Sequence, residues 1–249
     1  MSKSASARAG VVKSIVAEIR DFCVANADPA LVAKYAKFFR EGYDAFGLNY
    51  KNPGWQANRK SWGDRLRAAG PTAYLEAGDI LVRTGKYEEA AFAIEFAADL
   101  SDLHTADTFS RLAGWFDGGI RNWAHTDVFC SLVLSRFLVE GIVQLEALAP
   151  WVASQHKYQR RAAPVMLIPL LKQQKDYRPP LSLIEPLMSD AAREVQQGAG
   201  WFLREAWKLE PKPTEEFLMR YKNSAPRLIF QYATEKMTPD QRSRFRKAR

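Results

Sequence analysis

The sequence predicts an all-α protein on three observations. Apolar residues recur with the 3.6-residue period of a helix along most of the chain. The periodic runs are roughly 10–18 residues long, which is a usual helix length, and short breaks separate them. No Asn-Gly or Asp-Gly pair stands between alternating apolar residues, because Asp117-Gly118-Gly119 lies between two helical stretches instead.

Pairs of antiparallel helices stacked in a row, as in HEAT-like solenoids, suit this succession of runs. A plain helical bundle is the alternative, because the runs share little sequence identity and form no clean repeat. We expect breaks near residues 27–28, 41–54, 70, 85, 103–105, 118–121, 155–156, 176–180, 189–190, 211–213 and 223–225. The length of 249 residues suits one sizeable core, and we expect residues 1–249 to form a single domain.

The two ends of the chain are polar and basic. The first residues, MSKSASARAGVVKSIV, lack the continuous apolar segment of a signal peptide. We expect a loose leader over about residues 1–9, followed by a helix. The last residues, RSRFRKAR, belong to a basic tail over about residues 238–249, which is either a flexible arm for phosphates or a solvated end.

Proline and glycine delimit several helices. Pro71 opens PTAYLEAGDILV and Gly85 closes it, as expected of proline at a helix start and glycine past its end. KYEEAAFAIEFAADL has one apolar stripe and is predicted to be amphipathic, whereas DVFCSLVLSRFLVEGIV is almost wholly apolar and is predicted to be buried. Ser189 and Asp190 are expected to cap AAREVQQGAGWFLREAWKLE, which ends before Pro211.

The segment RRAAPVMLIPLL breaks a local rule, because Pro164 and Pro169 fall within a helical run. A proline inside a helix removes one backbone hydrogen bond and disturbs the preceding turn. Two interpretations are open. A helix begins near Pro164, with Arg160 and Arg161 in the loop before it, or a kinked helix runs through the proline and carries both arginines.

The composition is that of an ordinary globular protein with an excess of positive charge. The 36 lysines and arginines against 28 acids give a net charge of +8, which favours polyanionic partners such as nucleic acid. No apolar run approaches the roughly 18 residues of a membrane span, so we expect no membrane partner. Cys23 and Cys130 give no disulfide framework, and Cys130 falls in an apolar stretch where a packed thiol is expected. We therefore expect a cytoplasmic protein.

The sequence lacks the motifs of several enzyme classes. His104, His125 and His156 are dispersed, and none stands at a metal-ligand spacing with another histidine, cysteine or acid. The sequence contains no GxxxxGK[ST] loop, GxSxG elbow or GxGxxG turn. Phosphoryl transfer, serine hydrolysis and dinucleotide chemistry have no support, and we expect neither a metal nor another cofactor.

Two short stretches place an acid close to a tryptophan. In NWAHTD, Trp123 and Asp127 are four residues apart and lie one above the other on a helix. In GAGWFLRE, Trp201, Arg204 and Glu205 bring an aromatic ring, a cation and an acid to one helical face. Each stretch read alone has a plain structural explanation, which is an acid beside a core tryptophan or an aromatic anchor with a neighbouring charge pair.

Two further stretches are basic. In WVASQHKYQRRAA, Arg160 and Arg161 cannot face the same way on a helix, so one can meet an anion while the other meets solvent. A solvated basic patch is the plain explanation. LVAKYAKFFREGYDAFGL interleaves basic and aromatic residues, a pattern that suits a phosphate-facing helix over a core. Its basic residues are Lys34, Lys37 and Arg40, and Phe38 and Phe39 are expected in the core.

Taken in chain order, these stretches resemble the AlkD family of HEAT-repeat DNA glycosylases, within the wider alkylation-repair superfamily. The resemblance runs from about Leu31 to Lys208. AKYAKFFREGYDAFGL resembles the family's N-terminal segment, and NWAHTD matches its Trp-x-x-x-Asp. WVASQHKYQRRAA resembles its third motif, and GAGWFLRE resembles its closing Gly-Trp-x-Leu-Arg-Glu. Each motif is short, and their order and spacing carry the resemblance.

The resemblance implies a right-handed solenoid of HEAT-like repeats with a basic concave groove. It implies hydrolysis of the N-glycosidic bond of cationic alkylated purines, such as N3-methyladenine and N7-methylguanine, in double-stranded DNA. It implies a catalytic cluster of Trp123, Asp127 and Trp201. The DNA-binding residues expected with them are Arg161 on a backbone phosphate, Arg160, Tyr35, Arg204, Lys34 and Lys37. We expect a monomer that associates with the nucleoid when bound to DNA.

The sequence also departs from the family pattern. Tyr158 stands where relatives often carry tryptophan, Pro164 is unexpected in the third motif, and the phosphate contact falls on either Arg160 or Arg161. Some members of the superfamily bind DNA without detectable base release, so the fold alone does not secure the activity. A non-catalytic HEAT-like protein that binds damaged or branched DNA is therefore the second hypothesis. A helical protein-interaction scaffold is the third.

Overall fold

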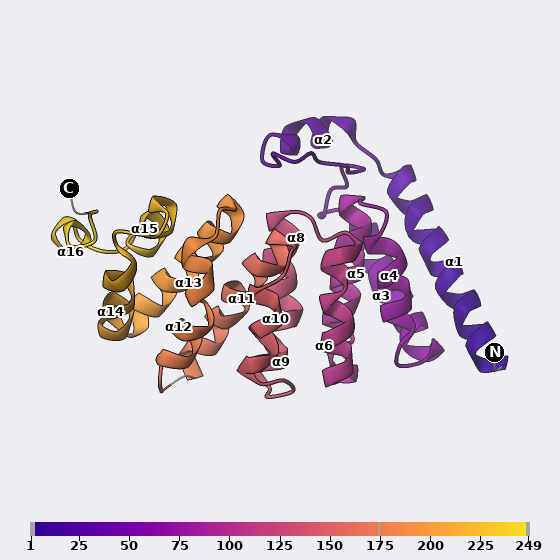
Figure 1. The fold of residues 1–249 in the computed structure, drawn as a ribbon. Helices are drawn as coiled ribbons and strands as arrows, with labels where there is room; N and C mark the ends of the chain where they lie inside the picture. The colour runs from indigo at the N-terminus through magenta and orange to yellow at the C-terminus, as the bar shows by residue number, and fades with distance from the viewer. Residues whose placement is uncertain (1–2, 174, 248–249) are drawn as a thin grey trace. The chain divides into compact units, whose positions relative to one another are not determined.

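The computed structural model describes residues 3–173 and 175–247, and every regular element within these ranges is a helix (Figure 1). The predicted all-α class is confirmed. Contacts between helices divide the chain into two compact units, residues 1–125 and 126–249, and each is described by itself. The single domain expected over residues 1–249 stays a prediction. No helix in the described ranges has both the length and the apolar character needed to cross a membrane.

The first unit is formed by helices that pack on their neighbours along the chain. Helix α4 contacts α1, α3 and α5, and α7 contacts α4 and α6. The bounds are α1 Lys3–Ala25, α2 Pro29–Ala36, α3 Pro53–Ala69, α4 Ala73–Val82, α5 Tyr87–Asp99, η1 Ser101–Leu103, α6 Ala106–Ala113 and α7 Trp115–Gly118. Gly78 on α4 makes this packing possible, because a Cβ atom there would lie 2.3 Å from the Trp115 ring.

Helix α1 begins earlier than the sequence predicted. The loose leader expected over about residues 1–9 is wrong for the described part, since the chain is helical from Lys3. The apolar stripe of α1, formed by Val12, Ile15, Val16, Ile19 and Cys23, is buried and holds the helix against its neighbours. Near its start, Arg8 forms an ion pair with Glu76 on α4. Residues 1–2 lie outside the described part.

The second unit contains longer helices near its centre. Helix α11 contacts α9, α10 and α13, and α13 contacts α14 and α15. After α8 (Trp123–Phe129), the bounds are η2 Cys130–Leu134, α9 Ser135–Val139, η3 Leu145–Leu148, α10 Ala149–Val152, α11 Lys157–Leu170, η4 Leu171–Gln173, α12 Arg178–Leu183, η5 Glu185–Ser189, α13 Arg193–Leu209, α14 Pro211–Tyr221, α15 Arg227–Ala233 and α16 Pro239–Ser243. This packing of successive helices is typical of helical-repeat proteins. A basic groove along both units stays a prediction.

Helix α11 decides between the two interpretations of its prolines. It runs from Lys157 to Leu170 and contains Pro164 and Pro169, so Arg160 and Arg161 lie on the helix and not in a loop before it. Both prolines are tolerated within a segment whose apolar side chains are mostly buried against α9, α10 and α13. Tertiary packing here outweighs the lost backbone hydrogen bonds.

Two boundaries differ from the prediction. The buried helix expected over DVFCSLVLSRFLVEGIV ends at Val139, and Gly141 follows with a φ of +71°, a left-handed conformation that suits glycine. The break expected at about 211–213 lies at Glu210 instead, because α14 begins at Pro211 itself. The described part of the basic tail is mostly exposed, but Phe245 is buried, and Arg227 donates to its carbonyl oxygen at 3.0 Å.

Candidate catalytic and nucleic-acid site

Helix α8 carries Trp123 and Asp127 one turn apart. Asn122 caps its start, since the Asn122 side-chain oxygen accepts the backbone N–H of His125 at 2.8 Å. The boundary between the two compact units falls within this helix, after His125. The surroundings of Trp123 are therefore described with the first unit and those of Asp127 with the second.

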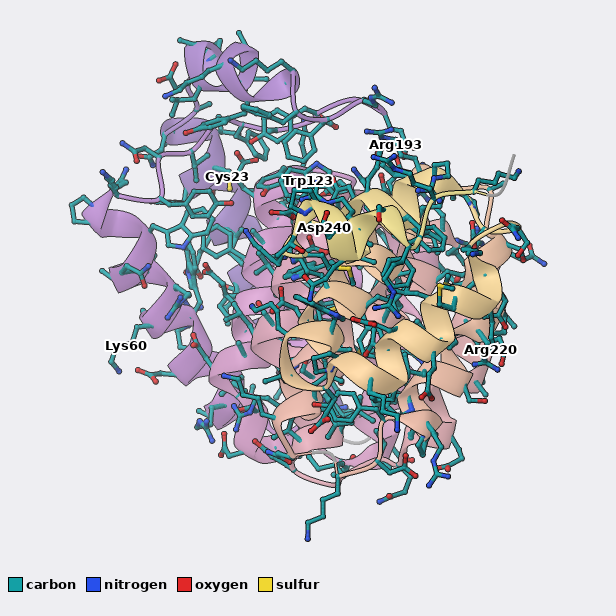
Figure 2. The ribbon with its side chains drawn as sticks, turned by 90° about the vertical axis from the view of Figure 1, so that its left-hand side faces the viewer. Cys23, Lys60, Trp123, Arg193, Arg220 and Asp240 are labelled. Carbon is teal, nitrogen blue, oxygen red and sulfur yellow. The ribbon has the colours of Figure 1, made fainter. Side chains whose placement is uncertain are left out.

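Trp123, labelled in Figure 2, is fixed at one edge while much of its surface stays accessible. Its indole Nε1 donates to the carbonyl oxygen of Phe38 at 3.1 Å. The Phe39 ring stacks on it with a centroid separation of 5.9 Å and an interplanar angle of 18°. Trp123 is nevertheless 42% exposed. An accessible indole face held in one orientation can contact a cationic ligand.

The residues that hold Trp123 were expected in the core, and for Phe38 this is wrong. Phe38 is 56% exposed and uses its backbone carbonyl, not its ring, to hold Trp123. Phe39 is half-buried and continues the stack to Tyr43, whose ring centroid is 4.5 Å away. Tyr87 meets both Phe39 and Tyr43 edge-on. These rings, with Trp123 at one end, form an aromatic stack that orders the loop after α2.

His125, on α8, packs against the Tyr87 ring of the aromatic stack. It is buried, and its ring stacks on Tyr87 at 4.2 Å. Asn122 Nδ2 lies 2.8 Å from His125 Nδ1, and His125 Nε2 lies 3.0 Å from the Tyr87 carbonyl oxygen. Burial lowers the pKa of His125 to about 4, so the ring is neutral at neutral pH. A neutral ring that accepts at Nδ1 and donates from Nε2 satisfies both contacts.

Glu88 on α5 anchors the same loop. Its carboxylate is 1% exposed and accepts three backbone N–H groups, from Phe46 at 2.8 Å, Gly47 at 2.8 Å and Leu48 at 3.1 Å. Gly47 permits this turn, because it has a φ of +83° and a Cβ atom there would lie 2.2 Å from the Asp28 carbonyl oxygen. A buried charge with several N–H donors is a strong anchor, so Glu88 fixes the segment that holds Trp123.

Asp127 is held by Arg161 in the second unit. Arg161 Nε donates to Asp127 Oδ1 and Arg161 Nη2 to Oδ2, both at 2.8 Å, which is a bidentate pair. The remaining Nη1 donates to the carbonyl oxygen of Glu194 on α13 at 2.7 Å. The side chain of Arg161 is 7% exposed and that of Asp127 is 19% exposed. The arginine is thus enclosed, and the carboxylate reaches solvent.

This geometry leaves Asp127 available for chemistry. Each carboxylate oxygen has two acceptor sites, and Arg161 uses one on each oxygen. The remaining sites can face a cation or a water molecule. The phosphate contact that sequence analysis expected of Arg161 would require its enclosed guanidinium group to leave Asp127 and the Glu194 carbonyl. The structure gives Arg161 the position of a residue that orients Asp127.

Arg160 is also engaged within the chain. Its guanidinium group pairs with Asp190 through Nε at 2.6 Å and Nη2 at 3.2 Å, and its Nη1 donates to the carbonyl oxygens of Ser154 and Gln155. Asp190 also accepts the backbone N–H of Ala192, but the capping role expected of Ser189 and Asp190 is wrong, because the cap position of α13 is Ala192 and no side chain bonds the helix there. Neither of the two arginines is therefore free to meet a phosphate without losing a carboxylate partner.

The segment after Asp127 is a π-helix, Cys130–Leu134, which sequence analysis did not anticipate. π-helical turns inside α-helices are frequent at functional sites. Cys130 is buried as expected, and its Sγ donates to the Ala162 carbonyl oxygen on α11 at 3.7 Å. Burial raises the pKa of the Cys130 thiol well above its usual range, so the thiol is a packing group here. Among the described residues, no group of three or more histidine, cysteine or acidic side chains could hold a metal ion.

Trp201 and Arg204 lie on α13. Glu194, Gly198 and Trp201 follow one another along one face of this helix. At Gly198 a Cβ atom would lie 3.1 Å from Arg161 Cγ, so α13 approaches Arg161 closely one turn before the half-buried Trp201. The membership of Trp201 in a catalytic cluster stays a prediction.

Arg204 does not have the free guanidinium group expected of a DNA contact. It pairs with Glu205 on its own helix and with Glu235 after α15, and its side chain is 19% exposed. The charge pair that sequence analysis gave as the plain explanation is therefore present. Because two carboxylates offset its charge, Arg204 is not among the DNA contacts that we propose below.

Helix α2 and Lys37 directly after it are exposed, and their DNA contacts stay a prediction. No residue of α2 is buried, and Tyr35 is 40% exposed. Lys34 Nζ lies 5.4 Å from the Tyr35 ring centroid, and Lys37 Nζ lies 5.2 Å from that of Phe38. Two exposed ammonium groups beside exposed rings can contact phosphates and sugars at the same time.

Sequence reasoning missed Glu88 and Asn122, the two polar residues that order the surroundings of Trp123. Glu88 and Glu89 stand next to each other at the start of an apolar helix, and both are buried. Adjacent acids at such a position were a signal, since they complement the helix dipole and can accept backbone N–H groups. Asn122, directly before α8, matched the usual type of a capping residue.

Comparisons with known proteins identify one family and one similar fold. Residues 21–237 match the model of a family described as "DNA alkylation repair enzyme". A solved structure described as a predicted DNA alkylation repair enzyme from Enterococcus faecalis has a similar fold, with a TM-score of 0.73 and 14% sequence identity. The likeness covers 86% of this chain and 98% of that one. No curated protein matches the sequence.

Proposed function

Because the chain belongs to the DNA alkylation repair enzyme family, we propose that it is a DNA N-glycosylase. Its substrates are cationic alkylated purines in double-stranded DNA, such as N3-methyladenine and N7-methylguanine. The reaction is hydrolysis of the bond between the purine nitrogen and C1′ of the deoxyribose. It needs no metal or other cofactor, and one protein molecule acts on one lesion.

One observation carries this proposal. Asp127 holds a carboxylate that Arg161 orients through two hydrogen bonds of 2.8 Å, and that carboxylate still reaches solvent. It lies one helical turn from Trp123, whose indole is fixed by Phe38 and remains 42% exposed. An oriented anion and an accessible aromatic face on one helix are the two groups that a developing cation requires.

The chemistry follows from the charge of the substrate. When the N-glycosidic bond breaks, its electron pair moves to the purine nitrogen and cancels the positive charge of the base. No general acid is therefore needed. Positive charge develops on the deoxyribose, where the Asp127 carboxylate stabilises it and orients water. The water oxygen bonds to C1′ and one proton is released.

Aromatic faces supply a second stabilising contact. The indole of Trp123 attracts the cationic sugar through its π-electrons, by roughly 0.5–2 kcal/mol. Trp201 is proposed as a second indole in this cluster. Because Phe39 and the Phe38 carbonyl hold Trp123, its orientation is set before DNA binds, and preorganised groups lose little entropy in the transition state.

DNA contacts are proposed for the exposed end of α2 and the residue that follows it. Tyr35, Lys34 and Lys37 present a ring and two ammonium groups to solvent. Arg161 and Arg160 make contacts within the chain in place of the DNA contacts implied by the resemblance. They hold Asp127 and Asp190 through bidentate pairs, and we propose that Arg161 acts on the reaction through Asp127.

The alternative is a protein that binds alkylated DNA without hydrolysing it. The Asp127–Arg161 pair favours it in one respect, because the guanidinium group offsets part of the negative charge that a cationic sugar would meet. Incubation of the protein with methylated duplex DNA distinguishes the two functions. Chromatography is expected to detect free methylated purines. Tight binding with no base released from several lesions would contradict the glycosylase and leave the binding protein.

A further inference from the structure

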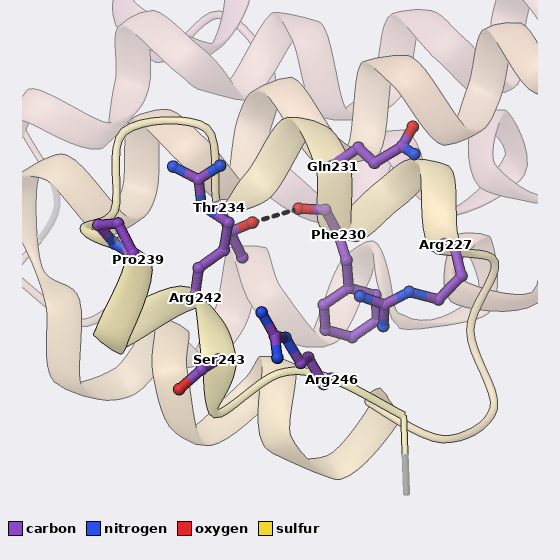
Figure 3. Close-up of a pocket in the computed structure, with 8 residues that line it drawn as sticks. All are labelled: Arg227, Phe230, Gln231, Thr234, Pro239, Arg242, Ser243 and Arg246. Carbon is purple, nitrogen blue, oxygen red and sulfur yellow. Dashed lines mark hydrogen bonds between the residues drawn. The ribbon is translucent and has the colours of Figure 1, made fainter. Parts of the chain in front are cut away.

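The C-terminal part of the second unit contains a pocket that the proposed reaction does not use. Its volume is about 460 Å³, and it lies between α15 and the segment around α16. Figure 3 shows the side chains of Arg227, Arg242 and Arg246 around it. Phe230 and Pro239 provide apolar wall. None of the described residues that line the pocket is acidic.

These three arginines differ from most others in the chain. Within residues 3–173 and 175–247, no ion pair joins any of them to a carboxylate, and the bonds they make go to backbone carbonyl oxygens. Arg227 donates to Phe245 and Arg242 to Met237, each at 3.0 Å. By contrast, a carboxylate partner is present for Arg59, Arg65, Arg67, Arg111, Arg160, Arg161, Arg204 and Arg244.

Arg244 is the most informative contrast, because it lies on the same short segment. It pairs with Glu215 on α14 at 2.7 Å and does not line the pocket. Arg242 and Arg246 flank it in sequence and are four residues apart, so both can face the pocket while Arg244 faces away. The segment thus carries one neutralised arginine and two that are not neutralised.

Three guanidinium groups around one cavity repel one another unless an anion lies between them. Guanidinium groups match the oxygens of phosphate in charge and in hydrogen-bond geometry. The Gln231 amide adds a neutral donor at the pocket wall, whereas the Ser243 hydroxyl already donates to the Asp240 carbonyl oxygen. The arginines are exposed, so a phosphate that is part of a long polymer can reach them.

We propose that this pocket binds a backbone phosphate of double-stranded DNA. It is a second contact point, separate from α8, since it shares no residue with the surroundings of Trp123 or Asp127. The face of α15 that packs on α13 is a different one, because Ile229 and Tyr232 meet Gly200 there. The family of the chain selects DNA as the polyanion. This phosphate contact requires no damaged base and does not depend on base release.

The test uses undamaged duplex DNA and the full chain, with binding followed by fluorescence anisotropy at several salt concentrations. For duplex DNA, the logarithm of the association constant decreases linearly with the logarithm of the salt concentration, and the magnitude of this slope is about 0.9 for each phosphate contact. The double variant Arg242→Gln, Arg246→Gln is expected to reduce the magnitude of this slope by about 1 and to weaken DNA binding at low salt. Arg244→Gln is the matched control, and it is expected to change the slope little, because Glu215 already offsets the Arg244 charge.

Two results of the duplex DNA titrations would overturn the proposal. One is a double variant that keeps the wild-type slope while thermal unfolding shows it to be folded. The other is an equal change in the double variant and in Arg244→Gln, which would indicate only a loss of general positive charge. A separate titration with inorganic phosphate distinguishes the source: a pocket that binds free phosphate, and whose loss leaves DNA binding unchanged, contradicts the DNA contact. Base release is not measured, so failure here leaves the glycosylase proposal standing.

Discussion

Arg161 Nε and Nη2 each lie 2.8 Å from one oxygen of Asp127, so the enclosed guanidinium group faces the carboxylate with two parallel hydrogen bonds. Arg161→Met keeps an unbranched apolar side chain and removes both bonds. We expect the free energy of unfolding to fall by roughly 2–4 kcal/mol, a little under the range for fully buried pairs. Base release is expected to fall at least tenfold, because Asp127 loses its orientation.

Arg160→Met is the matched control for that variant. Arg160 pairs with Asp190 in the same two-bonded manner and is also mostly enclosed, so a comparable loss of stability is expected. Base release is expected to remain near the wild-type level when both variants are assayed well below their unfolding temperatures. Equal losses of release in the two variants would show that Arg161 matters only for stability.

Gly198 tests the same pair without touching either member. A Cβ atom at this position would lie 3.1 Å from Arg161 Cγ and 3.2 Å from the Arg161 carbonyl oxygen. Gly198→Ala is expected to displace Arg161 by a few tenths of an ångström and to lower the single-turnover rate of base release about tenfold. Gly63→Ala is the control, because nothing lies within 4 Å of a Cβ atom there. It is expected to stabilise helix α3 by about 0.5–1 kcal/mol and to leave release unchanged.

Glu88→Gln tests the anchor of the aromatic stack. The change removes the charge that accepts three backbone N–H groups, and we expect the free energy of unfolding to fall by about 2–3 kcal/mol. Hydrogen exchange should become faster at the amides of Phe46, Gly47 and Leu48 before the rest of the chain opens. The control is Glu89→Gln, since Glu89 is equally buried but pairs with Arg20. Unchanged protection of the three amides in Glu88→Gln would contradict the anchor.

His125 gives the stability a defined pH dependence. Burial lowers its pKa to about 4, below the unfolded value of about 6.5, so between these values the unfolded chain binds more protons. The stability that a neutral His125 permits is complete above about pH 6.5 and is lost as the pH falls towards 4. Between pH 7.5 and 5 this contribution amounts to about 2 kcal/mol.

His125→Gln isolates that contribution from the titration of carboxyl groups. Chemical unfolding at pH 7.5 and pH 5 is expected to show a larger drop in stability for the wild type than for the variant. If His125 were protonated in the folded state, wild type and His125→Gln would lose the same free energy of unfolding between pH 7.5 and pH 5.

The helices were largely predictable, because their signals are local. Gly70 and Gly85 follow α3 and α4 as expected, and both have positive φ values. Gly141 carried the same signal and marks the break that sequence analysis missed. One of the two interpretations of Pro164 placed the start of a helix there. That interpretation is wrong, because the packing that tolerates the proline inside α11 comes from helices distant in sequence.

The candidate site was predictable only as a set of residues, not as a set of partners. Asp127 and Arg161 were both selected, yet the resemblance gave Arg161 to a phosphate, and their pairing joins positions 34 residues apart. Glu88 and Phe46 are 42 residues apart, and nothing in the pattern near either position indicates the other. Local periodicity reports which face of a helix is buried, whereas the contacts across helices depend on the tertiary packing.

The most direct measurement is the single-turnover rate of base release from methylated duplex DNA by wild type, Asp127→Asn and Asp190→Asn. Asp127→Asn is expected to lose nearly all release. Its DNA affinity is expected to stay the same or rise slightly, because Arg161 loses its counter-charge. Asp190→Asn also removes a carboxylate bonded to an arginine, and it is expected to retain release. Wild-type rates from Asp127→Asn, or equal losses in both variants, would contradict a catalytic Asp127.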